Sequence, residues 1–262
     1  MTRSKLQTRT KAFSPLVIVA AFAGALMVVV LQGQSNSPNN PQNARVEVSS
    51  KEPIADYSRS LDPDPVKRMT RQGRDKKHDR SEWRVHPEDV ADNSVRVDYL
   101  DPKLPAFPVG QSDAILVGEI LNANAYLSDD KTGVYSEFNV RVEQVLKNDG
   151  TLMPACSIDI EREGGRVRFP SGKIHSYSID KANMPQIGAK YILFLKRDGK
   201  DQPYYLLTGY ELRGDKIFPL DELPQFKAHQ DENRDVAFSE LAKTIARIRA
   251  HNFSAKHITV SG

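Results

Sequence analysis

The sequence predicts a mainly β domain, a small antiparallel β-barrel or sandwich, with one C-terminal α-helix. An N-terminal transmembrane helix and a disordered linker are expected before it. Three observations support this prediction. A single long apolar run lies near the N-terminus, a polar and proline-rich stretch follows it, and short apolar runs separated by turn residues fill most of the remainder. Short strands at such spacing are typical of all-β sandwiches and barrels.

The apolar run spans residues 13–31, FSPLVIVAAFAGALMVVVL, and residues 1–12 before it contain four basic and no acidic side chains. A helix of this length extends about 28 Å, close to the thickness of the hydrocarbon core of a bilayer. Basic residues that flank a membrane segment tend to stay in the cytoplasm. We therefore expect a cytoplasmic basic tail, a single-pass cell-membrane anchor and an extracytoplasmic C-terminal domain, in the periplasm or at the cell surface.

The alternative is a signal segment that is cleaved, after which the domain is secreted. A cleavage site favours small residues at its −3 and −1 positions, and the end of this run offers Gly33 but also Leu31. The apolar run is also longer than the core of a typical signal peptide. The uncleaved anchor is therefore the preferred interpretation.

Residues 32–110 have the composition of a disordered, charged and proline-rich linker. Nine of the sixteen prolines lie here, and large apolar residues are too sparse to offset the entropy lost on ordering. Residues 67–84 hold eight Lys and Arg side chains, and residues 88–101 then hold five acidic ones. The basic block is suited to a polyanion: anionic lipid, an envelope polymer or nucleic acid. A solvated linker whose two charged blocks attract each other is the simpler interpretation.

The β domain is expected at residues 111–222, and it begins with a buried strand at 114–121. After turn residues at 129–133, apolar Phe138, Val140 and Val142 alternate with polar neighbours, which is the clearest period-two stretch in the chain. Further strands are expected at 174–179, 190–196, 204–208 and 217–218. The tripeptide Arg213-Gly214-Asp215 is expected to form a hairpin turn, because Gly and Asp are common in turns.

A β-hairpin is predicted around Gly164-Gly165, because a glycine pair suits a two-residue turn. In that register Glu161 faces Arg168 and Glu163 faces Arg166, so that two pairs of opposite charge lie on one face. These pairs would fix the register of the hairpin.

A C-terminal amphipathic helix is expected at residues 231–250, after the strands. Phe238, Leu241, Ile245 and Ile248 recur at helical spacing and share one face. Acidic residues lie near its start and basic residues near its end, which suits the helix dipole. We expect this helix to pack on the sheet or to cap an open end of a barrel.

No catalytic, cofactor-binding or metal-binding residues are predicted, and no cofactor is expected. The segment 165–173 has the wrong glycine spacing for a phosphate-binding loop and fits strand, turn and strand instead. The six histidines show no HExxH motif or other close pairing of metal ligands. Of these, His175 is expected inside the fold, in a strand. The others, expected in solvent, are His78, His86, His229, His251 and His257.

Cys156 is the one cysteine of the chain, so that no disulfide within the chain can form. Its neighbours offer no base that would activate a thiolate. A small apolar side chain within the fold is the expected role of this residue.

Four segments occur in an order that is familiar from other proteins: 113–120, 134–147, 163–167 and 188–195. Together they resemble uncharacterised bacterial exported or membrane-anchored proteins with a small OB- or netrin-like β-barrel. The resemblance covers about residues 110–222. It implies the barrel and the extracytoplasmic compartment, and it implies no catalytic residues. Animal netrin-like modules are disulfide-bonded, a framework that a single cysteine does not allow.

Different classes of function stay open. The preferred hypothesis is a non-enzymatic, membrane-tethered binding module, whose partners are the membrane, through the N-terminal helix, and an unknown envelope or surface protein or polymer. No nucleic-acid partner is expected, because the net charge is only +3 and the domain is exported. One alternative is an extracytoplasmic hydrolase with a site assembled from distant residues such as Asp159, Glu161 and His175. Another is an inhibitor or assembly partner of an envelope protein.

Overall fold

The computed structural model describes residues 53–60, 63–79, 95–97, 101–148, 150, 152–197, 199 and 202–258, without the side chains of 95–97 and 252–258. The predicted basic tail and transmembrane segment lie outside these residues. Within the described part of the chain, no helix is both long enough and apolar enough to cross a membrane.

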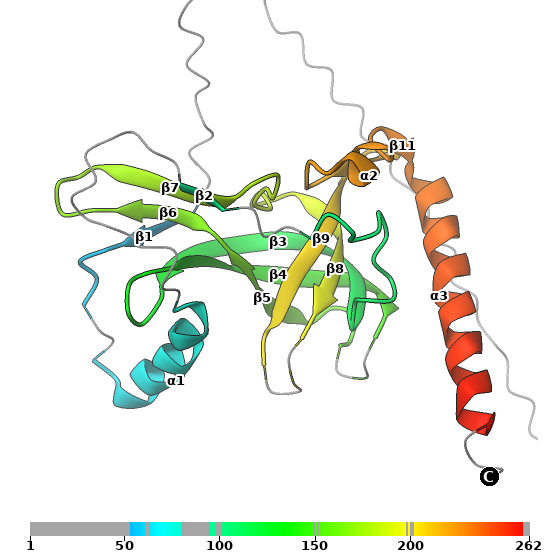
Figure 1. The fold of residues 1–262 in the computed structure, drawn as a ribbon, viewed down its shortest axis with the longest axis horizontal. Coiled ribbons are helices and arrows are strands. Elements are labelled where there is room, and N and C mark those ends of the chain that lie inside the picture. The colour runs from blue at the N-terminus through cyan, green and yellow to red at the C-terminus, as the bar shows by residue number, and fades with distance from the viewer. Residues whose placement is uncertain are drawn as a thin grey trace, which may run out of the picture. The chain divides into compact units, whose positions relative to one another are not determined.

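Figure 1 shows the described elements, which consist mainly of strands with one long helix at the C-terminal end. In chain order they are β1 (Ile54–Asp56), α1 (Pro65–Asp75), η1 (Lys76–His78), β2 (Val95–Val97), β3 (Ala114–Leu127), β4 (Val134–Lys147), β5 (Ser157–Glu163), β6 (Gly165–Arg168), β7 (Ile174–Ile179), β8 (Lys190–Lys196), β9 (Tyr204–Arg213), β10 (Lys216–Pro219), α2 (Pro224–Lys227), β11 (Glu232–Asn233) and α3 (Arg234–Ile258).

Five strands close into a ring in the order β3-β4-β5-β9-β8, because β8 pairs with β3 on one side and with β9 on the other. The ring neighbours are antiparallel except β5 and β9, which pair in parallel at Ile160–Tyr204 and Glu161–Tyr205. β10 and β11 continue the sheet beyond β9. The predictions of a mainly β domain and of a C-terminal helix are confirmed.

Two apolar cores lie on opposite faces of the ring strands. The inner core takes alternate residues, such as Leu193 of β8 and Phe138 of β4, both fully buried. The outer core takes the residues between them, such as Phe194 of β8, together with Leu241 of α3. As predicted, α3 therefore packs on the sheet. Burial on both faces explains why β8 is almost continuously apolar in sequence.

The helix α3 begins at Arg234, three residues later than predicted, and continues to Ile258. The side-chain Oδ1 of Asn233 accepts hydrogen bonds from the backbone N–H groups of Asp235 (2.9 Å) and Val236 (3.3 Å). This is the arrangement of an N-cap residue, which satisfies donors that the first turn of a helix leaves unpaired.

The prediction of a β-hairpin around Gly164-Gly165 is wrong. β5 pairs with β4 and β9, whereas β6 belongs to a separate sheet in the order β1-β6-β7-β2. Both glycines have positive φ, at 99° and 149°, and the chain turns there from one sheet into the other. A Cβ on Gly165 would approach the hydroxyl of Ser136 to 2.9 Å, so this crossing also requires glycine for space.

The prediction of disorder is wrong for part of the linker. Residues 53–60 and 63–79 form β1, α1 and η1, and β1 pairs in parallel with β6. Asp64 caps α1 by accepting hydrogen bonds from the N–H groups of Val66 (2.9 Å) and Lys67 (3.4 Å). Pro65 occupies the first helical position, where a backbone N–H would have no partner within the helix. No side chain of α1 is buried. Polar contacts hold this helix, so the scarcity of apolar residues gives no sign of it.

Candidate functional site

A cavity of about 750 Å³ lies between the segment that carries β1 and α1 and the turn that joins β3 to β4. Figure 1 shows α1 beside that end of the β3–β4 pair. Cationic side chains in the lining outnumber carboxylates by six to three. The cationic residues are Arg59, Lys67, Arg68, Arg71, Arg74 and Lys131.

Glu137 of β4 anchors α1 through two arginines. Arg71 donates from both terminal nitrogens to the carboxylate, with Nη2 at 3.1 Å from Oε2, and Arg74 Nη1 lies 3.2 Å from Oε1. The Glu137 side chain is 9% exposed, whereas those of the two arginines are about one-third exposed. Burial lowers the pKa of Arg71, but its hydrogen bonds to Glu137 and Tyr135 raise it further than burial lowers it. Arg71 therefore stays charged, and both arginines line the cavity.

Tyr135, the residue two before Glu137 on the same face of β4, forms the second contact with this segment. Its hydroxyl donates to Asp75 Oδ1 at 2.6 Å and accepts from Arg71 Nη1 at 3.1 Å. The ring of His78 stacks on the tyrosine ring with centroids 3.9 Å apart. Burial raises the pKa of the tyrosine well above its ordinary value, and burial also raises that of Asp75. Neutral Tyr135 thus connects the end of α1 to the sheet.

Two tyrosine rings orient cations at the cavity. The guanidinium carbon of Arg71 lies 3.8 Å from the ring centroid of Tyr126, and that of Arg59 lies 5.5 Å from it. Lys131 Nζ lies 4.6 Å from the ring centroid of Tyr57 and donates to the backbone carbonyl of that residue at 3.1 Å. Cation–π contacts of this kind hold the cations in place.

The turn at 128–133 closes one side of the cavity, and Asp130 organises it. Oδ1 of Asp130 accepts from the backbone N–H of Thr132 (2.9 Å), from the Thr132 hydroxyl (2.6 Å) and from the Ser128 hydroxyl (2.8 Å). Slight burial raises the pKa of Asp130, but these hydrogen bonds outweigh it and lower the pKa to about 2. The backbone N–H of Asp130 also donates to Asp79 at 3.0 Å, which connects the turn to the residue after η1.

Stability is expected to depend on Asp130 at neutral pH and not at very low pH. The folded-state pKa lies below the ordinary value of 3.8, so the stabilisation is present above that value and is lost as the pH falls through about 2. Urea unfolding of the protein and of Asp130→Asn at pH 7 and at pH 2 measures this. We expect a modest difference at pH 7, because the side chain is solvated, and a much smaller one at pH 2, where the carboxylate is about half protonated. An equal difference at both values would contradict the assignment.

The structure does not bring together the three residues considered for a hydrolase. Glu161 lies on the outer face of β5, where its Oε2 is 3.5 Å from Nε2 of His78. Asp159 accepts a hydrogen bond from the Asn139 side chain at 2.9 Å, and His175 lies on β7 with its ring edge-on to Phe169. Each of the three thus contacts a different neighbour.

Two histidines expected in solvent are packed instead. The side chain of His78 is only 12% exposed because the linker segment folds back onto β4. That of His229 is 21% exposed, and its ring contacts Phe107 with centroids 4.6 Å apart. His251 is exposed, as predicted, whereas His86 and the side chain of His257 lie outside the described residues.

The other motifs have the structural roles that the sequence predicts. Residues 165–173 form β6, a turn and the approach to β7, with the N–H of Phe169 donating to the carbonyl of Lys173 at 2.9 Å. The tripeptide at 213–215 forms the turn of the β9–β10 hairpin. Cys156 packs against the inner core, and its thiol donates to the carbonyl of Met153 at 2.8 Å.

The prediction of no site residues overlooked the cationic cavity. The basic block at 67–84 was a signal for it, and Asp64-Pro65 was a signal for the helix that carries its first half. The sequence does not show that Glu137, more than sixty residues away, receives this helix. In comparisons with known proteins, no family model and no curated protein matches the chain.

Proposed function

We propose that this chain is a membrane-tethered, extracytoplasmic binding module that takes a segment of an anionic polymer into the cavity beside α1. The observation that carries the proposal is that six cationic residues line one cavity. Several of these side chains are held in place by tyrosine rings or by Glu137. The predicted anchor at 13–31 and the remainder of the predicted linker would tether the module to the membrane.

The strand order supports an OB- or netrin-like barrel. In chain order β3, β4, β5, β8 and β9 are the first to fifth strands of the ring, and the third pairs in parallel with the fifth, as expected for a barrel of this type. OB-folds bind polymers on the face of their second and third strands and at the loop between the first and second. The equivalent positions here are the face of β4 and β5, where Arg74 of α1 binds Glu137 and His78 of η1 lies beside Glu161, and the turn at 128–133, which lines the cavity.

The cations indicate which chemical groups the ligand carries. A guanidinium that stacks on a ring keeps its N–H edge free for a carboxylate or a phosphate, which it binds with two parallel hydrogen bonds. The guanidinium carbon of Arg59 lies 5.5 Å from the ring centroid of Tyr126, within the range of a cation–π contact. Lys131 offers a compact charge from the turn at 128–133, which also lines the cavity. Carboxylate or phosphate groups spaced along an envelope polymer match this pair.

Isothermal titration of the full chain in detergent tests the proposal. The probes are oligogalacturonate for carboxylates, polyphosphate for phosphates, dextran as a neutral polymer and oligothymidylate as a nucleic acid. We expect binding of at least one of the first two probes, weaker at higher salt, and none of dextran. The preferred probe identifies the anionic group. A preference for dextran or for oligothymidylate would contradict the proposal.

The variants Arg59→Ala and Lys131→Ala are each expected to weaken binding of the preferred probe about tenfold or more, since a charged hydrogen bond contributes about 1.5–3 kcal/mol. Lys227→Ala is the matched control, because it removes an exposed charge from α2 that pairs with Glu222. It should leave binding unchanged. Equal losses in all three variants would mean that general charge attraction, and not the cavity, holds the probe.

A further inference from the structure

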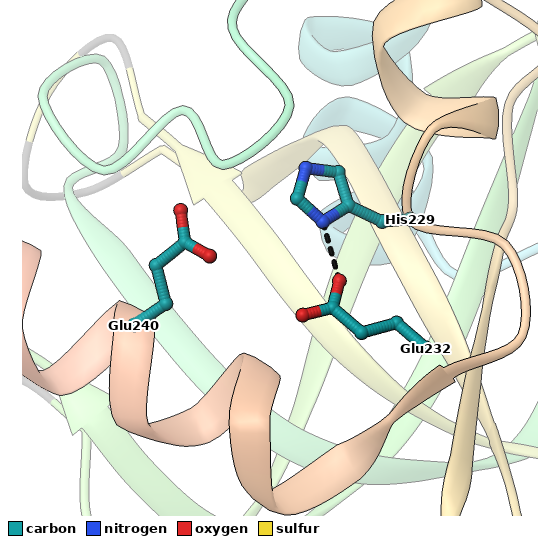
Figure 2. A group of neighbouring side chains, drawn as sticks. All are labelled: His229, Glu232 and Glu240. Atoms are coloured by element: carbon teal, nitrogen blue, oxygen red, sulfur yellow. Dashed lines mark hydrogen bonds and ion pairs between the residues drawn. The ribbon is translucent and has the colours of Figure 1, made fainter.

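A histidine and two glutamates meet where the chain passes from α2 to α3, away from the residues that line the cationic cavity. His229 follows α2, Glu232 begins β11, and Glu240 lies on the second turn of α3. One potential ligand atom from each residue lies within 4.8 Å of those of the other two. Figure 2 shows the Glu240 side chain extending from α3 toward the paired His229 and Glu232.

Local backbone contacts hold the first two residues together. Asp231, between them, has a left-handed φ of 67°, and its N–H donates to the carbonyl of Ile217 in β10 at 2.9 Å. The reversal brings Nδ1 of His229 to 2.5 Å from Oε2 of Glu232. Because the imidazole also packs against Phe107, its orientation is fixed before any ligand arrives.

The charges at this cluster are unbalanced. In the described part of the chain, no lysine or arginine forms an ion pair with Glu232 or Glu240, and the single imidazole is the partner of one carboxylate only. A cation is therefore the complement that these residues lack.

The donor atoms and their spacing indicate the kind of cation. Imidazole nitrogen with carboxylate oxygen suits zinc and similar transition metals, whereas Ca²⁺ and Mg²⁺ prefer oxygen ligands alone. Zinc bonds of about 2.0–2.2 Å place two ligand atoms roughly 3.0–3.5 Å apart. His229 and Glu232 would separate slightly, and the exposed side chain of Glu240 would move inward.

We propose that His229, Glu232 and Glu240 bind one divalent transition-metal ion of the zinc type, with water in the remaining coordination positions. The ion would join the segment after α2 to β11 and to the second turn of α3. It would thus stabilise the attachment of α3 to the outer core. Because an ion that binds only the folded state stabilises it, zinc should raise the thermal midpoint in a concentration-dependent manner.

The experiment uses the full chain in detergent, which is stripped of metal with a chelator and dialysed. It is then titrated with Zn²⁺, Ni²⁺, Ca²⁺ or Mg²⁺, and the heat of binding and the thermal midpoint are measured. We expect one zinc ion per chain, a higher thermal midpoint with Zn²⁺ or Ni²⁺, and no shift with Ca²⁺ or Mg²⁺. His229→Gln and Glu240→Gln should each weaken zinc binding about tenfold or more.

Asp235→Asn is the matched control, because Asp235 is an exposed carboxylate in the first turn of α3. It should leave the zinc affinity unchanged. Two results would overturn the proposal: no shift with Zn²⁺ or Ni²⁺, or a shift that Glu240→Gln retains in full. The second would assign the metal to other ligands and leave His229 and Glu232 as an ion pair.

Discussion

Replacing Asp221 by alanine is expected to lower the free energy of unfolding by about 3–5 kcal/mol, because it leaves a buried arginine without its counter-charge. Asp221 is 1% exposed and Arg162 is 5% exposed, and Arg162 Nη2 lies 2.5 Å from Asp221 Oδ1. The same carboxylate oxygen accepts from the backbone N–H of Asn183 at 3.0 Å. This loss would be a large part of the roughly 5–15 kcal/mol that stabilises a typical domain. Urea unfolding measures it.

Two further variants test the reason for this loss. Glu222→Ala, at the next position, breaks an exposed ion pair with Lys227 and should cost about 1 kcal/mol or less. The double variant Arg162→Met with Asp221→Leu should recover most of the stability, because apolar side chains can replace a buried ion pair without an unpaired charge. If Asp221→Ala cost no more than Glu222→Ala, Arg162 would have reached water and the buried pair would not be essential.

Replacing Gly133 by alanine is expected to displace η1 and the end of α1 from the ring. A Cβ at this position would lie 2.3 Å from the carbonyl oxygen of His78, a backbone atom that cannot move aside alone. Such overpacking typically costs about 1–3 kcal/mol. The cavity should therefore open while the ring stays folded. Trypsin cleavage within 67–77, which is rich in Lys and Arg, measures the release, and we expect faster cleavage than in the unaltered protein.

Two other glycines provide controls for Gly133→Ala. Gly110→Ala places its Cβ in open space and should leave the cleavage rate unchanged. Gly73→Ala adds a Cβ on α1, also with no atom within 4 Å, and should slow cleavage because alanine favours a helix over glycine by about 1 kcal/mol. Unchanged cleavage in Gly133→Ala would show that η1 does not need its close contact with the turn.

The ring strands could be predicted where local pattern and burial agree. β7 and β8 have the predicted bounds, since each lies between clear turn residues. β3 is longer than predicted, because beyond Glu119 it no longer pairs with β8 and carries polar residues such as Asn122 and Asn124. The strand that pairs with the segment after Gly164-Gly165 could not be predicted. The glycines mark a reversal, but a local pattern does not show that β6 pairs with β1, more than a hundred residues earlier.

Little of the two candidate sites could be predicted, and the reason is the same for both. Arg71 contacts Glu137 across 66 residues, and Glu240 approaches His229 only because β11 and α3 fold back beside it. In the sequence, each residue alone resembles a solvated surface group, and the sequence pattern therefore places His78 and His229 in solvent. Charged side chains gain a role from partners that only the tertiary structure supplies.

The two residue pairs that join β5 to β9 have a consequence for self-association. While these two pairs persist, β5 and β9 leave no free backbone edge between them, so a strand of a second chain cannot pair there. If the two pairs break, the run Tyr204-Tyr205-Leu206-Leu207 presents unpaired N–H and C=O groups on a segment of high β-propensity. Resistance of the molecule to fibrillar or amorphous aggregation therefore depends on its shortest strand contact within the ring.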